Sequence, residues 1–323
     1  MTIAISCGEP AGIGPEVAAA AWSALKGQLS LLWIGDPRHL PPGTPWIQVP
    51  DAAAAADVSG RALPVLVQDI GPPPSPGQPD PSHAAGVVAA IAKGVALAQA
   101  GAVDALCTAP ISKKALIDGA GFAYPGHTEY LAALSGVPRV VMMLACDALR
   151  VVPATIHIPL ADVPAALTAR LLTDTILITH AGLRRDFGIA RPRIAVAGLN
   201  PHAGEGGEFG REEIELISPV LDALRALGLD ITGPLSADTM FHPAARAAYD
   251  VAVCAYHDQA LIPIKTLDFT GGVNVTLGLP FVRTSPDHGT AFDIAGQGRA
   301  DPASMIAALR MAAQMARARR AAS

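Results

Sequence analysis

Short apolar runs alternate with longer, alanine-rich segments along most of the chain. The short runs predict strands at residues 2–7, 31–34, 105–108, 140–145, 151–156, 193–197 and 251–256. The longer segments predict helices at residues 15–26, 83–100, 112–119, 128–135, 160–187, 212–227 and 302–318. Strands that alternate with helices are typical of an α/β fold with a largely parallel sheet.

Length and composition favour a large globular protein. A chain of 323 residues is long for one compact domain, so two domains are expected. Hydrophobic residues make up 51% and charged residues 16%, which supplies a large core and excludes a disordered chain. The net charge of −5, without a concentrated basic face, argues against nucleic-acid binding.

Cysteine usage and hydropathy favour a cytoplasmic location. The four cysteines are scattered and form no C-x-x-C motif: Cys7, Cys107, Cys146 and Cys254. We expect them to be buried free thiols in a reducing compartment. The N-terminus does not have the pattern of a signal peptide. Lys93 and Asp104 interrupt the apolar stretch 86–106, so a membrane span is not expected.

A histidine follows each of three predicted strands. His157 follows the strand in VVPATIHIP, His202 follows that in IAVAGLNPH, and His257 follows that in VAVCAYHDQ. Strand carboxyl ends line the ligand crevice of open α/β sheets, so the three side chains can converge. Three neutral imidazoles suit zinc or a similar divalent ion and leave coordination positions open for substrate. Taken singly, each could be a hydrogen-bonded structural histidine; as a set, they favour a metal site.

Glycine-rich segments could bind an anion or merely turn the chain. GEPAGIGPEV places Pro15 in the first turn of a predicted helix, and helix N-termini favour anions. The segment is not G-x-G-x-x-G, which argues against a Rossmann site. In GHTEYLA, His127 and Thr128 precede a helix, where Thr128 could be an N-cap or part of an anion pocket. Four glycines after His202 would let the backbone approach a ligand.

Charged and amide side chains follow the third histidine. Lys265, Asn274 and Arg283 lie within a short stretch and would suit a phosphate or carboxylate. Taken singly, each is more often a surface residue. Asp238, in GPLSADTMF, could accept a proton or merely cap a turn.

Several longer motifs resemble one known family. They are GEPAGIGPE, GHTEYLA, VMMLA, GLNPHAGEGGEFG, GPLSADTMF, YHDQALIPIK and GVNVTLGLPFVRTSPDHGTAFDIAG. Together, from the first strand to the last helix, they resemble the 4-hydroxythreonine-4-phosphate dehydrogenase family of pyridoxal 5′-phosphate biosynthesis. The HxAGEGGxxG and YHDQ segments are highly specific. The wider family is similar to the isocitrate and isopropylmalate dehydrogenases.

The resemblance implies two α/β/α domains with largely parallel sheets, an isocitrate/isopropylmalate dehydrogenase-like fold and an active site in the inter-domain cleft. It predicts a discontinuous nucleotide-binding domain over residues 1–130 and 265–323, and a metal-binding and dimerisation domain over residues 131–264. It also implies a homodimer with the active site at its interface. The expected partners are therefore a second copy of the chain and a small phosphorylated substrate, with no nucleic acid or membrane.

The resemblance also assigns roles to residues. The implied ligands of a zinc, magnesium or cobalt ion are His157, His202 and His257. The implied substrate-binding residues are His127, Thr128, Lys265, Asn274 and Arg283. NAD, with NADP as the alternative, is expected against His288, Gly289 and Asp293. The candidates for catalytic proton transfer are Lys265 and Asp238.

The implied reaction is oxidation of the secondary hydroxyl of 4-phosphohydroxy-L-threonine by NAD. A divalent metal would lower the pKa of that hydroxyl. The resulting β-keto acid would lose carbon dioxide and give 3-amino-2-oxopropyl phosphate.

Three rival functions remain open at this stage. Relatives within the family oxidise phosphorylated sugar acids, such as 4-phospho-threonate or 4-phospho-erythronate, or aromatic cis-diol carboxylates. The set of Lys265, Asn274 and Arg283 favours a phosphorylated substrate over a diol. A zinc hydrolase would need the three histidines but would leave the DHGTAFDIAG segment without a role. A non-catalytic nucleotide-binding protein would leave the histidines unexplained.

Overall fold

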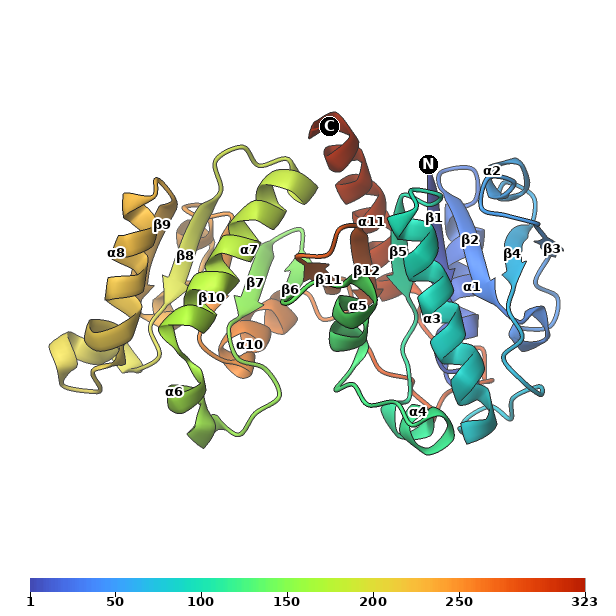
Figure 1. The fold of residues 1–323 in the computed structure, drawn as a ribbon, viewed down its shortest axis with the longest axis horizontal. Helices are drawn as coiled ribbons and strands as arrows, with labels where there is room; N and C mark the ends of the chain where they lie inside the picture. The colour runs from blue at the N-terminus through green and yellow to red at the C-terminus, as the bar shows by residue number, and fades with distance from the viewer. Residues whose placement is uncertain (323) are drawn as a thin grey trace. The chain divides into compact units, whose positions relative to one another are not determined.

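The computed structural model describes residues 1–322, which divide into two compact units (Figure 1). The first unit comprises Met1–Val140 and Leu279–Arg320, and the second contains Val141–Gly278. The bounds differ from the predicted domains: residues 131–140 lie in the first unit, and residues 265–278 lie in the second. Both units combine a sheet with helices, so the predicted α/β class is confirmed.

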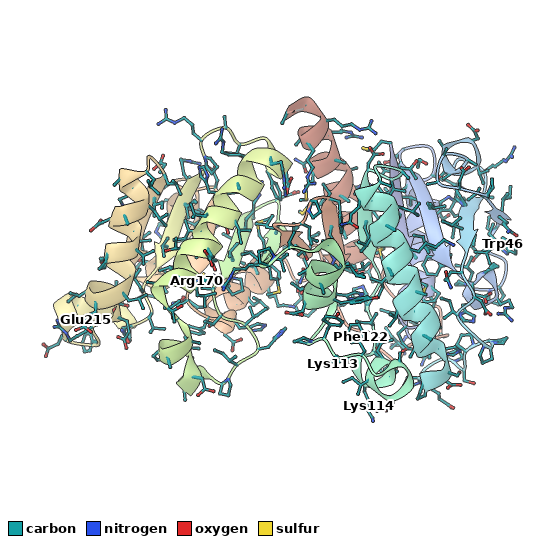
Figure 2. All side chains as sticks on the ribbon, in the orientation of Figure 1. Trp46, Lys113, Lys114, Phe122, Arg170 and Glu215 are labelled. Atoms are coloured by element: carbon teal, nitrogen blue, oxygen red, sulfur yellow. The ribbon has the colours of Figure 1, made fainter. Side chains whose placement is uncertain are left out.

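The sheet of the first unit has the strand order β3-β4-β2-β1-β5-β12. Its strands are β1 (Thr2–Ser6), β2 (Ser30–Gly35), β3 (Trp46–Gln48), β4 (Leu63–Val67), β5 (Ala105–Thr108) and β12 (Val282–Pro286). Each neighbouring pair in that order is parallel. Trp46 on the edge strand β3 points outward and is 43% exposed (Figure 2). Because all of these strands run parallel, their carboxyl ends meet at one edge of the sheet.

The helices of the first unit cover this sheet. They are α1 (Gly14–Leu25), α2 (Ala55–Val58), α3 (Ala84–Gln99), α4 (Lys113–Ala120), α5 (His127–Ser135) and α11 (Ala303–Ala322), with 3-10 turns η1 (Pro37–His39) and η2 (Pro81–His83). The segment Pro81–Gln99 is long and apolar enough to span a membrane by length and composition alone. It packs on β1, β2 and β5 and buries Val87, Ile91 and Val95, as a core helix does (Figure 1).

The sheet of the second unit has the strand order β11-β6-β7-β10-β8-β9. Its strands are β6 (Val141–Cys146), β7 (Leu149–Pro153), β8 (Arg193–Ala197), β9 (Asp230–Leu235), β10 (Val251–Cys254) and β11 (Val273–Leu277). β7, β10, β8 and β9 are parallel, whereas β6 is antiparallel to both β7 and β11. The strands are therefore largely parallel, as predicted, and β6 is the exception.

Helices and short turns of the second unit follow the strands. They are α6 (Val163–Ala166), α7 (Ala169–Phe187), α8 (Ser218–Ala226), α9 (Pro243–Arg246), α10 (His257–Leu267), the 3-10 turns η3 (Leu160–Asp162), η4 (Pro201–Gly207) and η6 (Ala237–Thr239), and the π-helix η5 (Glu213–Ile217). The predicted helix 160–187 is interrupted, because Thr168 caps α7 by accepting a hydrogen bond from the Leu171 N–H. The predicted strand 251–256 ends at Cys254.

The four cysteines are buried free thiols, as predicted. Burial raises the pKa of Cys7 and of Cys107 to about 12. These thiols are therefore protonated at neutral pH and serve as small apolar core residues.

Candidate functional site

The second unit carries the three histidines that follow strands. His157 lies in the loop after β7, His202 in η4 after β8, and His257 at the first position of α10 after β10. The rings of His157 and His257 lie 5.6 Å apart between centroids. Both line a cavity of about 250 Å³, together with Thr155, Tyr256 and neighbouring residues. Since β7, β10 and β8 are adjacent and parallel, the three histidines lie along the same sheet edge.

Two of these histidines have an unusual backbone. His157 has φ 54° and His202 has φ 52°, in the left-handed region that favours glycine. A non-glycine residue there costs roughly 1–3 kcal/mol and persists only where its surroundings impose it. Such positions cluster at functional sites, so the strain supports a role for both side chains.

The donor chemistry of the histidines suits a divalent metal. The Nδ1 atom of His257 hydrogen-bonds Asp258 Oδ1 at 2.7 Å, which leaves Nε2 as the ring nitrogen that can bind a ligand. Within residues 1–322, no group of three or more His, Cys, Asp or Glu side chains is arranged so that it could hold a metal ion. The structure thus brings His157 and His257 together but does not group His202 with them; its ring lies 6.1 Å from that of Phe209.

The first unit contains a buried arginine at a strand end. Arg283 on β12 is 3% exposed, and its Nη2 donates a hydrogen bond of 2.6 Å to Thr108 Oγ1 at the end of β5. Burial lowers the pKa of Arg283 to about 10, against the opposing effects of Cys107 and Glu129. The guanidinium is therefore still a cation at neutral pH, and a buried cation favours an anionic ligand.

The start of α5 lies in the electrostatic field of this arginine. Burial, and then the charge of Arg283, lower the pKa of His127 well below its usual value, so the imidazole is neutral. Its Nε2 is buried and has no hydrogen-bond partner within the described residues. The N-cap is Gly126, and Thr128 is the second helical residue, so the prediction of Thr128 as a cap was wrong. The first-turn N–H groups, His127 and Arg283 together suit a phosphate or carboxylate.

Three further predicted site residues lie in the second unit. Asp238 is exposed in η6, where its Oδ1 accepts a hydrogen bond from Ser236 Oγ at 2.6 Å, and it does not cap a helix. Lys265 lies in α10, with its Nζ 5.5 Å from the ring centroid of Phe269. Asn274 is half-buried on β11. Thr108 and Ser236, which contact predicted site residues, were missed by the sequence reasoning, although Thr108 ends a predicted strand.

The segment predicted to bind NAD packs on the first glycine-rich turn. The Ile13 N–H donates to the Thr290 carbonyl at 3.0 Å, and the Gly296 N–H donates to Glu16. A β-carbon on Gly12 would lie 2.8 Å from the Thr290 oxygen, so glycine is required for this approach.

The same segment carries both buried and exposed polar groups. His288 Nδ1 lies 2.9 Å from the Gly289 carbonyl, while its Nε2 is buried without a partner in the part of the chain that is described. Gly289 has open space around it, and Asp293 is exposed. A neighbouring cavity of about 420 Å³ is lined by Gly12, Glu16, Arg38, Gly296 and adjacent residues. Gly296 of this segment lines the cavity, whereas His288, Gly289 and Asp293 are not among its lining residues. The partnerless Nε2 atom of His288 is the observation that suits a polar ligand.

These features define a class: an α/β protein with histidines at parallel strand ends and a buried arginine at a strand of the first unit. Residues 30–312 match the family described as "Pyridoxal phosphate biosynthetic protein PdxA". A protein of Roseobacter denitrificans named 4-hydroxythreonine-4-phosphate dehydrogenase is 65% identical over 315 residues, covering 97% of each chain. The chain belongs to the PdxA family of pyridoxal phosphate biosynthetic proteins, so the family expected from its motifs is confirmed.

Solved structures agree with this family. A 4-hydroxythreonine-4-phosphate dehydrogenase from Klebsiella pneumoniae is 39% identical, with a TM-score of 0.88 over 98% of this chain and 99% of that one. A terephthalate 1,2-cis-dihydrodiol dehydrogenase from Burkholderia xenovorans is 32% identical, with a TM-score of 0.66 over 97% and 98%. The fold is thus shared by proteins named for different substrates.

Proposed function

We propose that this protein is a cytoplasmic 4-hydroxythreonine-4-phosphate dehydrogenase that uses NAD and a divalent metal. It would oxidise the secondary hydroxyl of 4-phosphohydroxy-L-threonine, and the product would lose carbon dioxide to give 3-amino-2-oxopropyl phosphate. The observation that carries this proposal is the 65% identity, over 97% of both chains, to a protein of that name.

In this proposal, the phosphate is bound by residues of the first unit. Arg283 supplies a buried positive charge oriented by Thr108, and His127 supplies a neutral imidazole at the start of α5. Thr128 adds first-turn N–H and hydroxyl groups. Lys265 and Asn274 of the second unit are proposed to bind further substrate oxygens. A phosphate with these partners would be held by charge-assisted hydrogen bonds.

The metal would be held by His157, His202 and His257. A bound divalent ion supplies Lewis acidity, which lowers the pKa of a substrate hydroxyl and stabilises negative charge on oxygen. The left-handed backbone of His157 and His202 restricts the direction in which each side chain leaves the main chain. Asp258 holds the His257 ring in one orientation.

NAD would accept the hydride and lie against His288, Gly289 and Asp293. Asp238 and Lys265 are proposed for proton transfer. Asp238 is exposed, so its carboxylate is accessible to a proton donor. The Ser236 hydroxyl donates a hydrogen bond to one of its oxygens. Lys265 lies in α10, the helix that begins at His257.

A phosphorylated sugar acid is the alternative substrate, because it would present the same phosphate to Arg283. One assay separates the candidates. The protein is supplied with NAD, a divalent metal and either 4-phosphohydroxy-L-threonine or 4-phospho-threonate, and NADH is followed. NADH from the amino substrate supports the proposal, NADH from the sugar acid alone selects the alternative, and NADH from neither contradicts both.

We further propose that the protein is a homodimer formed through its second unit. That unit exposes large apolar side chains, of which Ile158 is 40% exposed, Leu160 67%, Ile262 63% and Phe269 75%. Exposed apolar groups of this size favour association with another surface. Analytical ultracentrifugation tests this: an Ile262→Asp variant should shift from dimer toward monomer, and a wild-type monomer would contradict the proposal.

A further inference from the structure

The turn that carries His202 is a short left-handed helix. His202, Ala203, Gly204, Glu205 and Gly206 all have φ between 43° and 82°. Glycines adopt this conformation readily, but the other three residues each bear a β-carbon that disfavours it by roughly 1–2 kcal/mol. The turn is therefore not stable by itself and needs support from its surroundings.

A buried carboxylate provides that support. Glu213, the first residue of the π-helix η5, is 3% exposed. One of its oxygens accepts a hydrogen bond of 2.8 Å from the backbone N–H of Asn200, and the other accepts one of 3.0 Å from Asn200 Nδ2. Asn200 is the N-cap of η4, so both bonds act just before His202. The second Nδ2 hydrogen goes to Glu212 at 2.7 Å.

The turn is shaped around this carboxylate. A β-carbon on Gly204 would lie 2.6 Å from Glu213 Oε2, and one on Gly198 would lie 3.0 Å from Glu213 Oε1. The carboxylate thus occupies the space that side chains at these positions would need. π-helical turns are rare and often occur at functional sites, and here η5 begins at the supporting residue.

We propose that Glu213, acting through Asn200, is the positioning residue that holds His202 in its left-handed turn and so sets the affinity for the metal. The inference rests on the proposed function, since it takes His202 to be a metal ligand. Loss of a group that orients a metal ligand typically weakens metal binding 10- to 100-fold.

The test compares two glutamate variants. In Glu213→Gln, an NH2 group must face one of the two Asn200 donors whichever way the amide turns, so zinc affinity should fall about 10- to 100-fold. The visible spectrum of the cobalt-loaded protein should also change. Glu215→Gln is the matched control, because it makes the same change of charge in the same π-helix at an exposed residue (Figure 2). The Glu215 carboxylate pairs with Arg211 and not with Asn200. It should bind zinc like the wild type.

A rescue separates positioning from general damage. Adding Glu205→Gly to Glu213→Gln removes one disfavoured β-carbon from the turn and should restore part of the lost zinc affinity. NAD affinity should be unchanged throughout. Wild-type zinc affinity in Glu213→Gln, or no recovery with Glu205→Gly, would overturn the inference. If Glu213→Gln does not fold, Asn200→Ala takes its place under the same expectation.

The inference and the proposed function fail in different ways. If the wild-type protein itself binds no divalent metal, the proposed function is contradicted and the inference falls with it. If the wild type binds zinc and both glutamate variants match it, only the inference is overturned.

Discussion

The imidazole rings of His157, in the loop after β7, and His257, at the start of α10, lie 5.6 Å apart, and the segments before them are joined beyond the ends of their strands. The ladder between β7 and β10 continues through the Ala154 N–H, which donates to the Cys254 carbonyl, and the Thr155 N–H, which donates to that of Ala255. The Thr155 hydroxyl adds a bond of 2.8 Å to the same Ala255 carbonyl. These bonds bring together the two backbone segments that lead into the histidines.

Replacing either paired histidine should abolish metal-dependent turnover without unfolding the protein. In His157→Ala and His257→Ala, activity should fall at least about 100-fold, because first-sphere ligands matter more than the groups that orient them. His180→Ala on α7 is the control and should remain active. Turnover is measured with and without added zinc. Full activity of either variant in metal-free buffer would remove that histidine from the metal site.

Arg283→Lys should selectively weaken the binding of phosphorylated ligands. Lysine keeps the charge but loses the guanidinium fork that contacts Thr108, at a cost of about 1.5–3 kcal/mol for a charged hydrogen bond. The KM for the phosphorylated substrate should rise about 10- to 100-fold with little change in the KM for NAD. Arg317→Lys, at an exposed position of α11, should behave like the wild type. An equal rise in both KM values would argue against a specific phosphate contact.

Gly12→Ala should weaken NAD binding through the segment at Thr290. The new β-carbon would lie 2.8 Å from the Thr290 oxygen, so the segment must shift at a cost of about 1–3 kcal/mol. Gly60→Ala, which adds its methyl group in open space at an unstrained φ, is the matched control. Calorimetric titration with NAD and urea unfolding measure both effects. If the Gly12→Ala variant is destabilised but binds NAD as tightly as the wild type, the segment at Thr290 is not part of the nucleotide site.

The half-buried His127, whose Nε2 atom is fully buried, should make the protein less stable in mildly acidic solution. Its pKa is lowered in the folded state, so below pH 6.5 the unfolded chain binds this proton more readily than the folded one. The free energy of unfolding should therefore rise with pH in that window and lose this contribution as the pH falls. His127→Gln should flatten the slope in urea unfolding between pH 5.5 and 7.5. Burial also lowers the pKa of His39, but His39 is present in both proteins. The difference between their two slopes therefore isolates His127.

Strands and their terminal histidines were the features best predicted from the sequence. Residues 105–108 and 193–197 match β5 and β8 residue for residue, because buried parallel strands are continuous apolar runs. The helix α10 was not predicted, because Pro263 within it reads as a helix breaker. The strand β3 has only three residues, which is too short to show a strand pattern in the sequence.

The geometry of the site was less accessible to sequence reasoning. The left-handed turn at His202 contains Ala203 and Glu205, residue types that give no local sign of positive φ. Its support by Glu213 and the contact between Arg283 and Thr108 are tertiary interactions. No periodicity along the chain encodes such pairs.

The stoichiometry of a single reaction tests the central claim most directly. The protein is incubated with limiting 4-phosphohydroxy-L-threonine, excess NAD and zinc, and NADH, carbon dioxide and inorganic phosphate are measured together. An oxidative decarboxylation predicts one NADH and one carbon dioxide for each substrate consumed, with no phosphate released. Release of phosphate without NADH would instead identify a metal-dependent hydrolase and contradict the proposed function.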